Sequence, residues 1–153
     1  MKRVSSKKKP FAVICILLLA LFLISACNES NRQFAYKDGT YIGKSREDDT
    51  GAYGEVTIII TSGQISSCKF VTWQADGSIK DMEYGKVNGE VSNKDYYNKA
   101  QLAVDAMEKY AKQYEQTKKT KNVDVIAGAT IAYDQFLEAV NSALKDAVQT
   151  SVK

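Results

Sequence analysis

The chain has 153 residues, of which 44% are hydrophobic, and it carries 21 lysines and arginines against 18 acidic residues. Its length is sufficient for one domain with a single hydrophobic core. Because it contains no histidine, zinc sites with histidine ligands, nucleophiles activated by a histidine and c-type haem attachment are excluded.

Residues 1–26 have the pattern of an export signal rather than of a folded element. Basic residues open the chain, at Lys2, Arg3, Lys7, Lys8 and Lys9. The apolar run Phe11–Ile24 that follows is too short to span a membrane comfortably. Small residues then precede Cys27, an arrangement that resembles the lipobox of bacterial lipoproteins. This resemblance implies cleavage before Cys27, acylation of its thiol and a lipid anchor at the extracytoplasmic face of the cell membrane. An uncleaved anchor helix is the alternative.

Removal of residues 1–26 reverses the sign of the net charge. Five basic residues and no acidic ones leave with that segment, so residues 27–153 keep 16 basic against 18 acidic residues, a net charge of −2. Without a concentrated basic face, nucleic acid is not an expected partner. Apart from the acylated Cys27, only Cys68 remains, which excludes an internal disulfide. Redox chemistry would therefore require an organic cofactor or a metal held by carboxylates.

The polar residues 27–37 are expected to form a lipidated tether, and residues 38–153 a single domain. A short strand is predicted over Thr40–Gly43, after the turn-forming Asp38-Gly39. The charged run Arg46–Gly51 is interpreted as a solvated loop.

A hairpin is the clearest strand signal. Apolar and polar residues alternate over Glu55–Thr61, which is typical of a half-buried strand, and Ser62-Gly63 then turns the chain into a partner strand, Ile65–Trp73. The segment Met82–Glu90 contains two glycines and is compatible with a loop or a short edge strand.

Helices dominate the second half. A helical period of apolar residues predicts one helix over Asp95–Glu115, followed by a polar connector, Gln116–Asn122. A brief extended segment, Val123–Ile126, precedes a final helix whose apolar face includes residues from Tyr133 to Val148. Strands followed by helices indicate an α+β domain, with a small antiparallel sheet and two main helices packed on one side.

A distinctive group of residues precedes the final helix: Asp124, Gly128, Ala129 and Thr130. A helix start presents unpaired N–H groups and the positive end of the helix dipole, so a phosphate group is stabilised there. Gly128 and Ala129 leave room for close approach to the backbone, and Thr130 offers a hydroxyl. The plainer interpretation is that Thr130 caps the helix and Gly128 shapes the turn before it.

The run Asp124-Val125-Ile126-Ala127-Gly128-Ala129-Thr130 resembles Asp-x-x-[Ser/Thr]-Gly-Ala-[Ser/Thr], the flavin-acceptor motif of the FMN-binding domain family. That family includes flavin-carrying subunits of sodium-pumping quinone reductases and extracellular flavin lipoproteins of Gram-positive bacteria. The similarity extends from Asp38 to about Ala147. The chain departs from the motif at Ala127, where a serine or threonine is usual.

The resemblance implies that a flavin transferase uses FAD and Mg²⁺ to join FMN to the Thr130 hydroxyl through a phosphoester. Asp124 would support this transfer, while Gly128 and Ala129 would give access to the hydroxyl.

Aromatic side chains should cover the flavin ring, and Trp73, Tyr84 and Tyr53 are the candidates. The resemblance also implies a membrane electron donor and an extracellular acceptor, so that the protein acts as a redox carrier rather than as an enzyme with its own substrate. A flavin-free or reversibly flavin-binding surface lipoprotein, acting as a binding module, is the alternative, and Ala127 is its main support.

Overall fold

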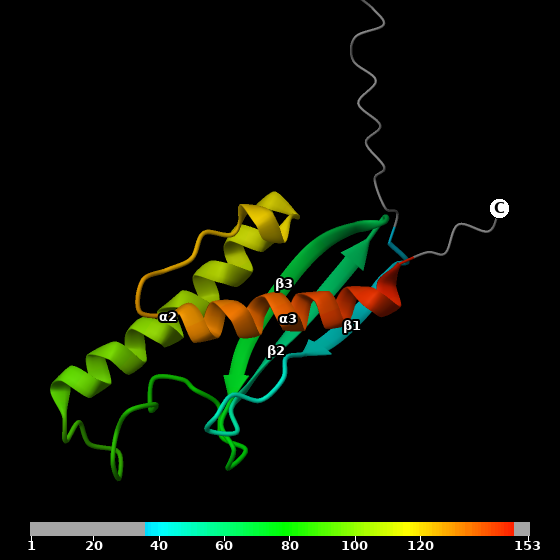
Figure 1. The fold of residues 1–153 in the computed structure, drawn as a ribbon. Coiled ribbons are helices and arrows are strands. Elements are labelled where there is room, and N and C mark those ends of the chain that lie inside the picture. The colour runs from blue at the N-terminus through cyan, green and yellow to red at the C-terminus, as the bar shows by residue number, and fades with distance from the viewer. Residues whose placement is uncertain (1–35, 149–153) are drawn as a thin grey trace, which may run out of the picture. The chain divides into compact units, whose positions relative to one another are not determined.

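A computed structural model describes residues 36–148 of the chain. The signal segment, Cys27 and most of the tether lie outside these residues, so the interpretations placed on them stay predictions. The described part is an α+β fold in which a three-stranded sheet precedes two long helices (Figure 1). This is the fold class that the sequence predicts.

The sheet is antiparallel, with strand order β1-β2-β3. Its strands are β1 (Gly39–Lys44), β2 (Tyr53–Thr61) and β3 (Gln64–Trp73). Ser62 and Gly63, with φ angles of 54° and 72°, form the two-residue connection between β2 and β3, as a type I′ hairpin turn requires. The Asp38 carboxylate accepts hydrogen bonds from both of their N–H groups, at 2.9 and 2.8 Å. These bonds lower the pKa of Asp38 below its usual value.

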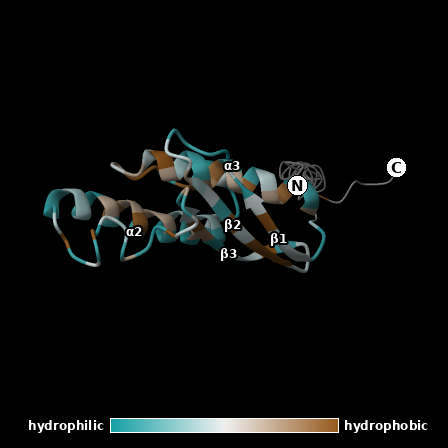
Figure 2. Ribbon diagram, turned by 90° about the horizontal axis from the view of Figure 1, so that it is seen from below, coloured by the Kyte–Doolittle hydropathy of each residue, from teal (hydrophilic) through white to brown (hydrophobic). Residues whose placement is uncertain are grey.

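One face of the sheet is buried, and both helices pack on it. Val56, Ile58 and Ile60 of β2 are at most 2% exposed, because alternate residues of a strand point to the same face. The core between sheet and helices is completed by aromatic rings, with Phe70 and Phe136 in edge contact at 5.2 Å between ring centroids. Hydrophobic stretches alternate with hydrophilic ones along the strands and helices (Figure 2).

The helices are α2 (Lys94–Thr117) and α3 (Thr130–Ala147), separated by a 3₁₀ turn, η1 (Thr120–Asn122). The Asn93 side chain caps α2 by accepting a hydrogen bond from the N–H of Tyr96 at 3.0 Å. The polar connector predicted over Gln116–Asn122 contains the last residues of α2 and all of η1. Between Met82 and Glu90 the structure has turns and an isolated bridge from Val87 to Glu90, but no regular strand.

Helix α3 approaches the sheet closely at Gly43 of β1. A Cβ atom at this position would lie 2.1 Å from the carbonyl oxygen of Ala139 and 2.3 Å from the backbone nitrogen of Ala143. Real Cβ atoms do not approach backbone this closely, so only glycine permits the contact. The small residues of α3 thus fix the distance between helix and strand.

The two ends of the described chain meet at the C-terminal end of α3. Tyr36 pairs with Val148 in an isolated bridge, and the N–H of Lys37 donates to the carbonyl of Ala147 at 2.9 Å. Val148, predicted as helical, lies just beyond α3 and in extended conformation. None of the helices within residues 36–148 has the length and apolar character needed to cross a bilayer.

Candidate functional site

The segment before α3 forms a tight turn around Gly128. The N–H of Ala129 donates to the carbonyl of Ile126 at 3.0 Å, and Gly128, third in this turn, has a φ of 84°. This conformation disfavours residues with a side chain. A Cβ at Gly128 would also lie 2.7 Å from Cδ2 of Leu102 on α2. Glycine is therefore favoured by the turn itself, and a side chain at this position would also displace the exposed end of Leu102.

Helix α2 holds this turn through a fully buried tyrosine. The Tyr110 hydroxyl accepts a hydrogen bond from the N–H of Ile126 at 3.0 Å and donates one to the carbonyl of Ala129 at 3.2 Å. Burial raises the pKa of the Tyr110 phenol above its usual value. One turn further along α2, the side-chain oxygen of Gln113 accepts from the N–H of Asp124 at 2.7 Å. The path of the backbone from Asp124 to Ala129 is thus set by α2.

Thr130 is the first residue of α3 and its side chain is exposed. The cap position is occupied by Ala129, with φ −129° and ψ 27°, and no side-chain hydrogen bond caps this helix. The alternative in which Thr130 serves only as a cap is therefore wrong, since its hydroxyl does not close the helix start. The first N–H groups of a helix have no partner inside it, and the residues that carry them, Thr130, Ile131 and Ala132, line a cavity.

This cavity, which we call the α3 cavity, has a volume of about 430 Å³. Its walls come from the start of α3, from Ala103, Val104 and Met107 of α2, and from buried Thr72 of β3. The Thr72 hydroxyl donates to the Met107 sulfur at 3.0 Å. Ligand sites of this size with mainly apolar walls and a few polar groups accept drug-sized molecules. Helix N–H groups at one side and apolar side chains of α2 beside them fit the phosphate and the ring of FMN.

A loop from the sheet closes another side of the cavity, and α3 holds it there. The backbone N–H and the guanidinium of Arg46 donate to the carboxylate of Glu138, as an ion pair. The buried amide of Gln135 donates to the carbonyl of Ala52 at 3.0 Å. Between these two contacts lie Asp48 and Thr50, which line the α3 cavity.

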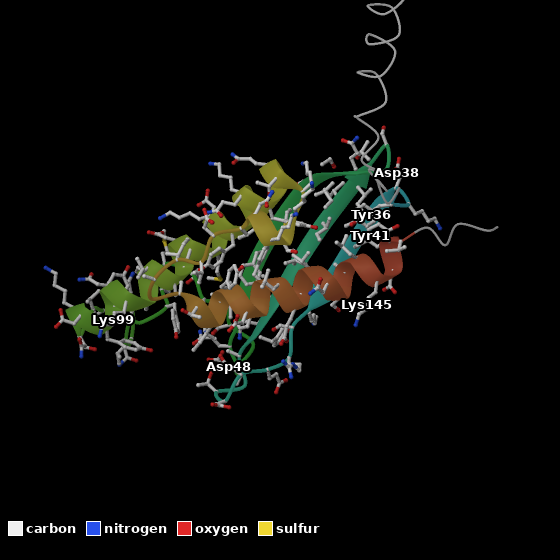
Figure 3. All side chains as sticks on the ribbon, turned by 45° about the horizontal axis from the view of Figure 1, so that its top comes forward. Tyr36, Asp38, Tyr41, Asp48, Lys99 and Lys145 are labelled. Atoms are coloured by element: carbon white, nitrogen blue, oxygen red, sulfur yellow. The ribbon has the colours of Figure 1, made fainter. Side chains whose placement is uncertain are left out.

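Asp48 is well supplied with hydrogen-bond donors. Its Oδ1 atom accepts from the backbone N–H groups of Thr50 and Ala52, at 2.9 and 3.0 Å, and from the Thr50 hydroxyl at 2.6 Å. Partial burial acts to raise the pKa of Asp48, but these bonds outweigh it and the net effect is a lowered pKa. Asp48 is therefore an anion at neutral pH. It lies at the end of the domain away from Tyr36 and Asp38 (Figure 3).

The connection between β3 and α2 supplies two further cavity residues, Lys80 and Tyr84. The Lys80 ammonium lies 5.2 Å from the centre of the Tyr84 ring, a cation–π contact. Burial is the main cause that raises the pKa of Tyr84 to about 12, followed by its neighbour Tyr96. Burial also lowers the pKa of Lys80, against the opposing effect of Asp48.

Four of the residues that the sequence singles out line this one cavity: Gly128, Ala129, Thr130 and Tyr84. Asp124 does not line it. Its side chain is exposed, and only its backbone N–H is engaged, by Gln113. Ala127 is exposed at the corner of the turn, so the missing hydroxyl leaves no buried polar group of the fold unpaired.

Trp73 and Tyr53 are not brought to the cavity. They are directly paired across β2 and β3, so they share one face of the sheet. That face is the one opposite to Val56 and the helices, because odd-numbered residues of β2 point away from its buried even-numbered ones. The expected cover of a flavin ring by Trp73 is therefore not a feature of the α3 cavity.

The sequence interpretation misses Asp48, Lys80 and Gln135. Asp48 lies in a run that has the composition of a solvated loop, and nothing local distinguishes it from the neighbouring acids. A signal exists for Gln135, since it is a polar residue on the apolar face of the final helix, next to Phe136, and it is 6% exposed. No local pattern indicates that Lys80 lines the same cavity as the start of α3.

Comparison with known proteins agrees with this geometry. The model of the FMN-binding domain family matches residues 51–145, from the loop before β2 to the last turns of α3. A search of curated proteins gives no match.

Two solved structures are similar to the chain. A crystal structure of a Clostridium perfringens protein has a TM-score of 0.57 at 24% identity, covering 73% of this chain and 88% of that one. A solution NMR structure of a Clostridium thermocellum protein has a TM-score of 0.45 at 23% identity, covering 76% of this chain and 98% of that one. The likeness to the first concerns the fold alone. Because the family model spans more than half of the sequence, including the turn at Gly128 and the start of α3, the chain belongs to the FMN-binding domain family.

Proposed function

We propose that this protein is a membrane-anchored, extracytoplasmic flavoprotein that carries FMN on Thr130 and relays electrons. The observation that carries the proposal is the exposed Thr130 side chain at the start of α3, beside a cavity of about 430 Å³ in a chain of the FMN-binding domain family. The Thr130 hydroxyl is accessible to an attaching enzyme, while the cavity next to it can receive the cofactor.

Attachment would be a group transfer in which a flavin transferase uses FAD and Mg²⁺. The P–O bond between the FMN phosphorus and the bridging oxygen of the FAD pyrophosphate would break, the Thr130 oxygen would form an ester with that phosphorus, AMP would leave with the bridging oxygen, and the hydroxyl proton would be released. The chain's own part is to present the hydroxyl and to stabilise the resulting negative charge by the N–H groups and dipole of α3. Asp124, exposed and six residues upstream of Thr130, is accessible to the Mg²⁺-bearing transferase.

Once bound, FMN would supply the capacity to accept and release electrons, and the protein would supply placement and tuning. The donor in this proposal is a membrane dehydrogenase and the acceptor lies outside the cell. The tether would join the domain at Tyr36, next to Val148, whereas Thr130 begins α3 at the other end of this helix. A helix of 18 residues is about 27 Å long, at 1.5 Å per residue. The flavin would thus be held at the end of α3 opposite to the one where the tether joins the domain.

The test is co-expression of the full chain with a flavin transferase, followed by fluorescence of a denaturing gel and mass analysis of peptides. Wild type should give a fluorescent band and one FMN on the peptide that contains Thr130. Thr130→Ala should abolish both, Thr130→Ser should keep them, and Asp124→Ala should lose most of the label while the domain stays folded. Thr120→Ala, at the start of η1, is the matched control and should be labelled normally. Label on Thr130→Ala equal to that of wild type would refute attachment at this residue.

Ala127 favours a second candidate, a lipoprotein that binds flavin reversibly and acts as a binding module. In that case FMN would occupy the α3 cavity without an ester bond. The two functions differ in one observation, because yellow colour that survives denaturation requires a covalent bond. Colour that is lost on denaturation, together with unchanged binding in Thr130→Ala, would support the binding module.

A further inference from the structure

Lys80 is a cation built into the wall of the α3 cavity. Its backbone N–H donates to the carbonyl of Thr72 at 2.8 Å, which fixes the residue at the end of β3. Its side chain is half-buried and lies 5.2 Å from the centre of the Tyr84 ring. The contact with Tyr84 holds the ammonium in place without neutralising its charge, since Tyr84 remains protonated at neutral pH with a pKa of about 12.

No carboxylate pairs with this ammonium within the part of the chain that the structure describes. The negative charge of Asp48 acts on this ammonium and opposes the lowering of its pKa by burial. However, Oδ1 of Asp48 already accepts three hydrogen bonds from Thr50 and Ala52, and Oδ2 has the amide of Gln135 at 3.4 Å. A half-buried ammonium that forms no ion pair within residues 36–148 keeps its positive charge available to a group that enters the cavity. Its place in the cavity wall therefore suits an electron-rich ligand group beside it.

The position of Lys80 distinguishes it from the phosphate-binding end of the cavity. Lys80 and Tyr84 also line an adjoining hollow of about 350 Å³ that no residue of α3 lines. With Val104 and Met107, Lys80 further lines the large groove between α2 and β3. The ammonium thus lies where the cavity continues away from the helix start, on the side of the apolar α2 residues that would cover a ring.

We propose that Lys80 is the residue that tunes the flavin, by placing its ammonium beside the ring and stabilising the negative charge that the ring gains on reduction. This inference rests on the proposed function. When bound FMN takes two electrons and one proton from a reduced donor such as the membrane dehydrogenase, the donor is oxidised and the flavin gains one net negative charge. Lys80 stabilises that charge by Coulomb attraction in a partly desolvated site, where the interaction is stronger than in water. Lys80 therefore raises the reduction potential and is a positioning charge rather than a catalytic residue.

The chain offers a matched control for this role. Lys86 belongs to the same connection and also lies over a tyrosine ring, that of Tyr97, at 5.9 Å. However, it forms an ion pair with Glu83 at 2.8 Å and lines neither the α3 cavity nor the adjoining hollow. Methionine keeps much of the apolar stem of lysine and removes only the charge. Lys80→Met and Lys86→Met therefore differ in whether the lost charge faces the cavity.

The experiment measures the two-electron midpoint potential of the full chain, flavinylated in cells and solubilised in detergent. In Lys80→Met the reduced flavin should be stabilised at least tenfold less than in wild type. For a two-electron couple, this makes the midpoint potential more negative by about 30 mV. Lys80→Arg should restore most of the wild-type value, and Lys86→Met should match wild type. Equal potentials in Lys80→Met and wild type, or equal shifts in Lys80→Met and Lys86→Met, would overturn the inference. A loss of FMN content in Lys80→Met with an unchanged potential would also overturn it, because it would place Lys80 at the phosphate.

A second measurement separates this inference from the proposed function. Thr130→Ala and Thr130→Ala/Lys80→Met are titrated with free oxidised and free reduced FMN. Loss of Lys80 should weaken binding of reduced FMN at least tenfold more than binding of oxidised FMN, even if attachment at Thr130 never occurs. A larger loss of affinity for reduced than for oxidised FMN would support the inference even if covalent attachment at Thr130 were shown not to occur. Equal effects on the two forms, or no binding of either form by either variant, would reject it.

Discussion

The hydroxyl of Tyr110 donates a hydrogen bond to the backbone carbonyl of Ala129, at 3.2 Å. Ala129 is the cap residue of α3 and directly precedes Thr130. Through this bond, and a second one from Ile126, the middle of α2 positions the residue that would carry the cofactor. The geometry of the turn before α3 therefore depends on a buried side chain that lies outside the motif.

Tyr110→Phe tests this dependence. The change keeps the buried ring but leaves the N–H of Ile126 without its partner and removes one of the two hydrogen bonds to the carbonyl of Ala129, which also accepts from the N–H of Tyr133. We therefore expect a loss of about 1 to 3 kcal/mol in the free energy of unfolding. Flavin attachment should fall as well, because the turn is no longer held. Tyr41→Phe is the control. Its hydroxyl donates to the carbonyl of Lys37 at 2.8 Å in an exposed position at the other end of the domain (Figure 3). Equal labelling of Tyr110→Phe and Tyr41→Phe would contradict the positioning role.

Gly128→Ala should disturb the acceptor turn more than it disturbs the fold. A residue with a side chain at a φ of 84° costs about 1 to 2 kcal/mol, and the new Cβ would displace the exposed end of Leu102 from the turn. Gly77→Ala is a matched control, since Gly77 has a φ of 83° and a Cβ added there would meet no heavy atom within 4 Å. Chemical denaturation should show similar losses of stability in the two variants, whereas flavin attachment should fall only in Gly128→Ala. Similar labelling of both would mean that the turn tolerates a side chain.

The ion pair between Arg46 and Glu138 predicts a pH dependence. Hydrogen bonds from Arg46 lower the pKa of Glu138 from its ordinary value of 4.5 to about 2. A carboxyl group whose pKa is lowered in the folded state stabilises the protein at pH values above its pKa in the unfolded state. This contribution is lost as the pH falls through its pKa in the folded state. Glu138→Gln should therefore be less stable than wild type at pH 7, and the difference should shrink between pH 4.5 and pH 2. Thermal unfolding across this range measures it.

Glu47→Gln serves as the control for that series, because Glu47 lies in the same loop and forms no ion pair among residues 36–148. Its unfolding temperature should follow that of wild type at each pH. A difference between wild type and Glu138→Gln that stays constant down to pH 2 would refute the role of the ion pair.

Cys27→Ala tests the proposed anchor. Without the thiol, acylation and the cleavage that depends on it should fail, so an unprocessed or shed protein should replace the mature form in the membrane fraction. Mass analysis of fractionated cells distinguishes these forms. Cys15→Ala, within the apolar run, should leave processing unchanged. Mature protein that stays firmly membrane-bound in Cys27→Ala would exclude lipidation as the anchor.

Several elements can be predicted from the sequence because their signals are local. Alternation at Val56, Ile58 and Ile60 indicates a strand with one buried face, since side chains alternate along any extended chain. The helical period from Tyr133 onward likewise indicates α3. The order of Asp124, Gly128 and Thr130 identifies the turn before α3, and this order also leads to the family. Burial and hydrogen bonding in the structure agree with the strands and the helix.

The composition of the site is decided by tertiary structure. Arg46 and Glu138 are 92 residues apart in the chain, yet their contact brings Asp48 to the cavity beside Thr130. Trp73 is expected at the flavin from its residue type, but its register with Tyr53 places it on the opposite face of the sheet. Periodicity reports which face of an element is buried, whereas the neighbours of that face depend on how distant segments pack. The sequence alone therefore determined the strands, the helices and the turn before α3, and only the packing of α2, α3 and the loop before β2 decided which side chains surround that turn.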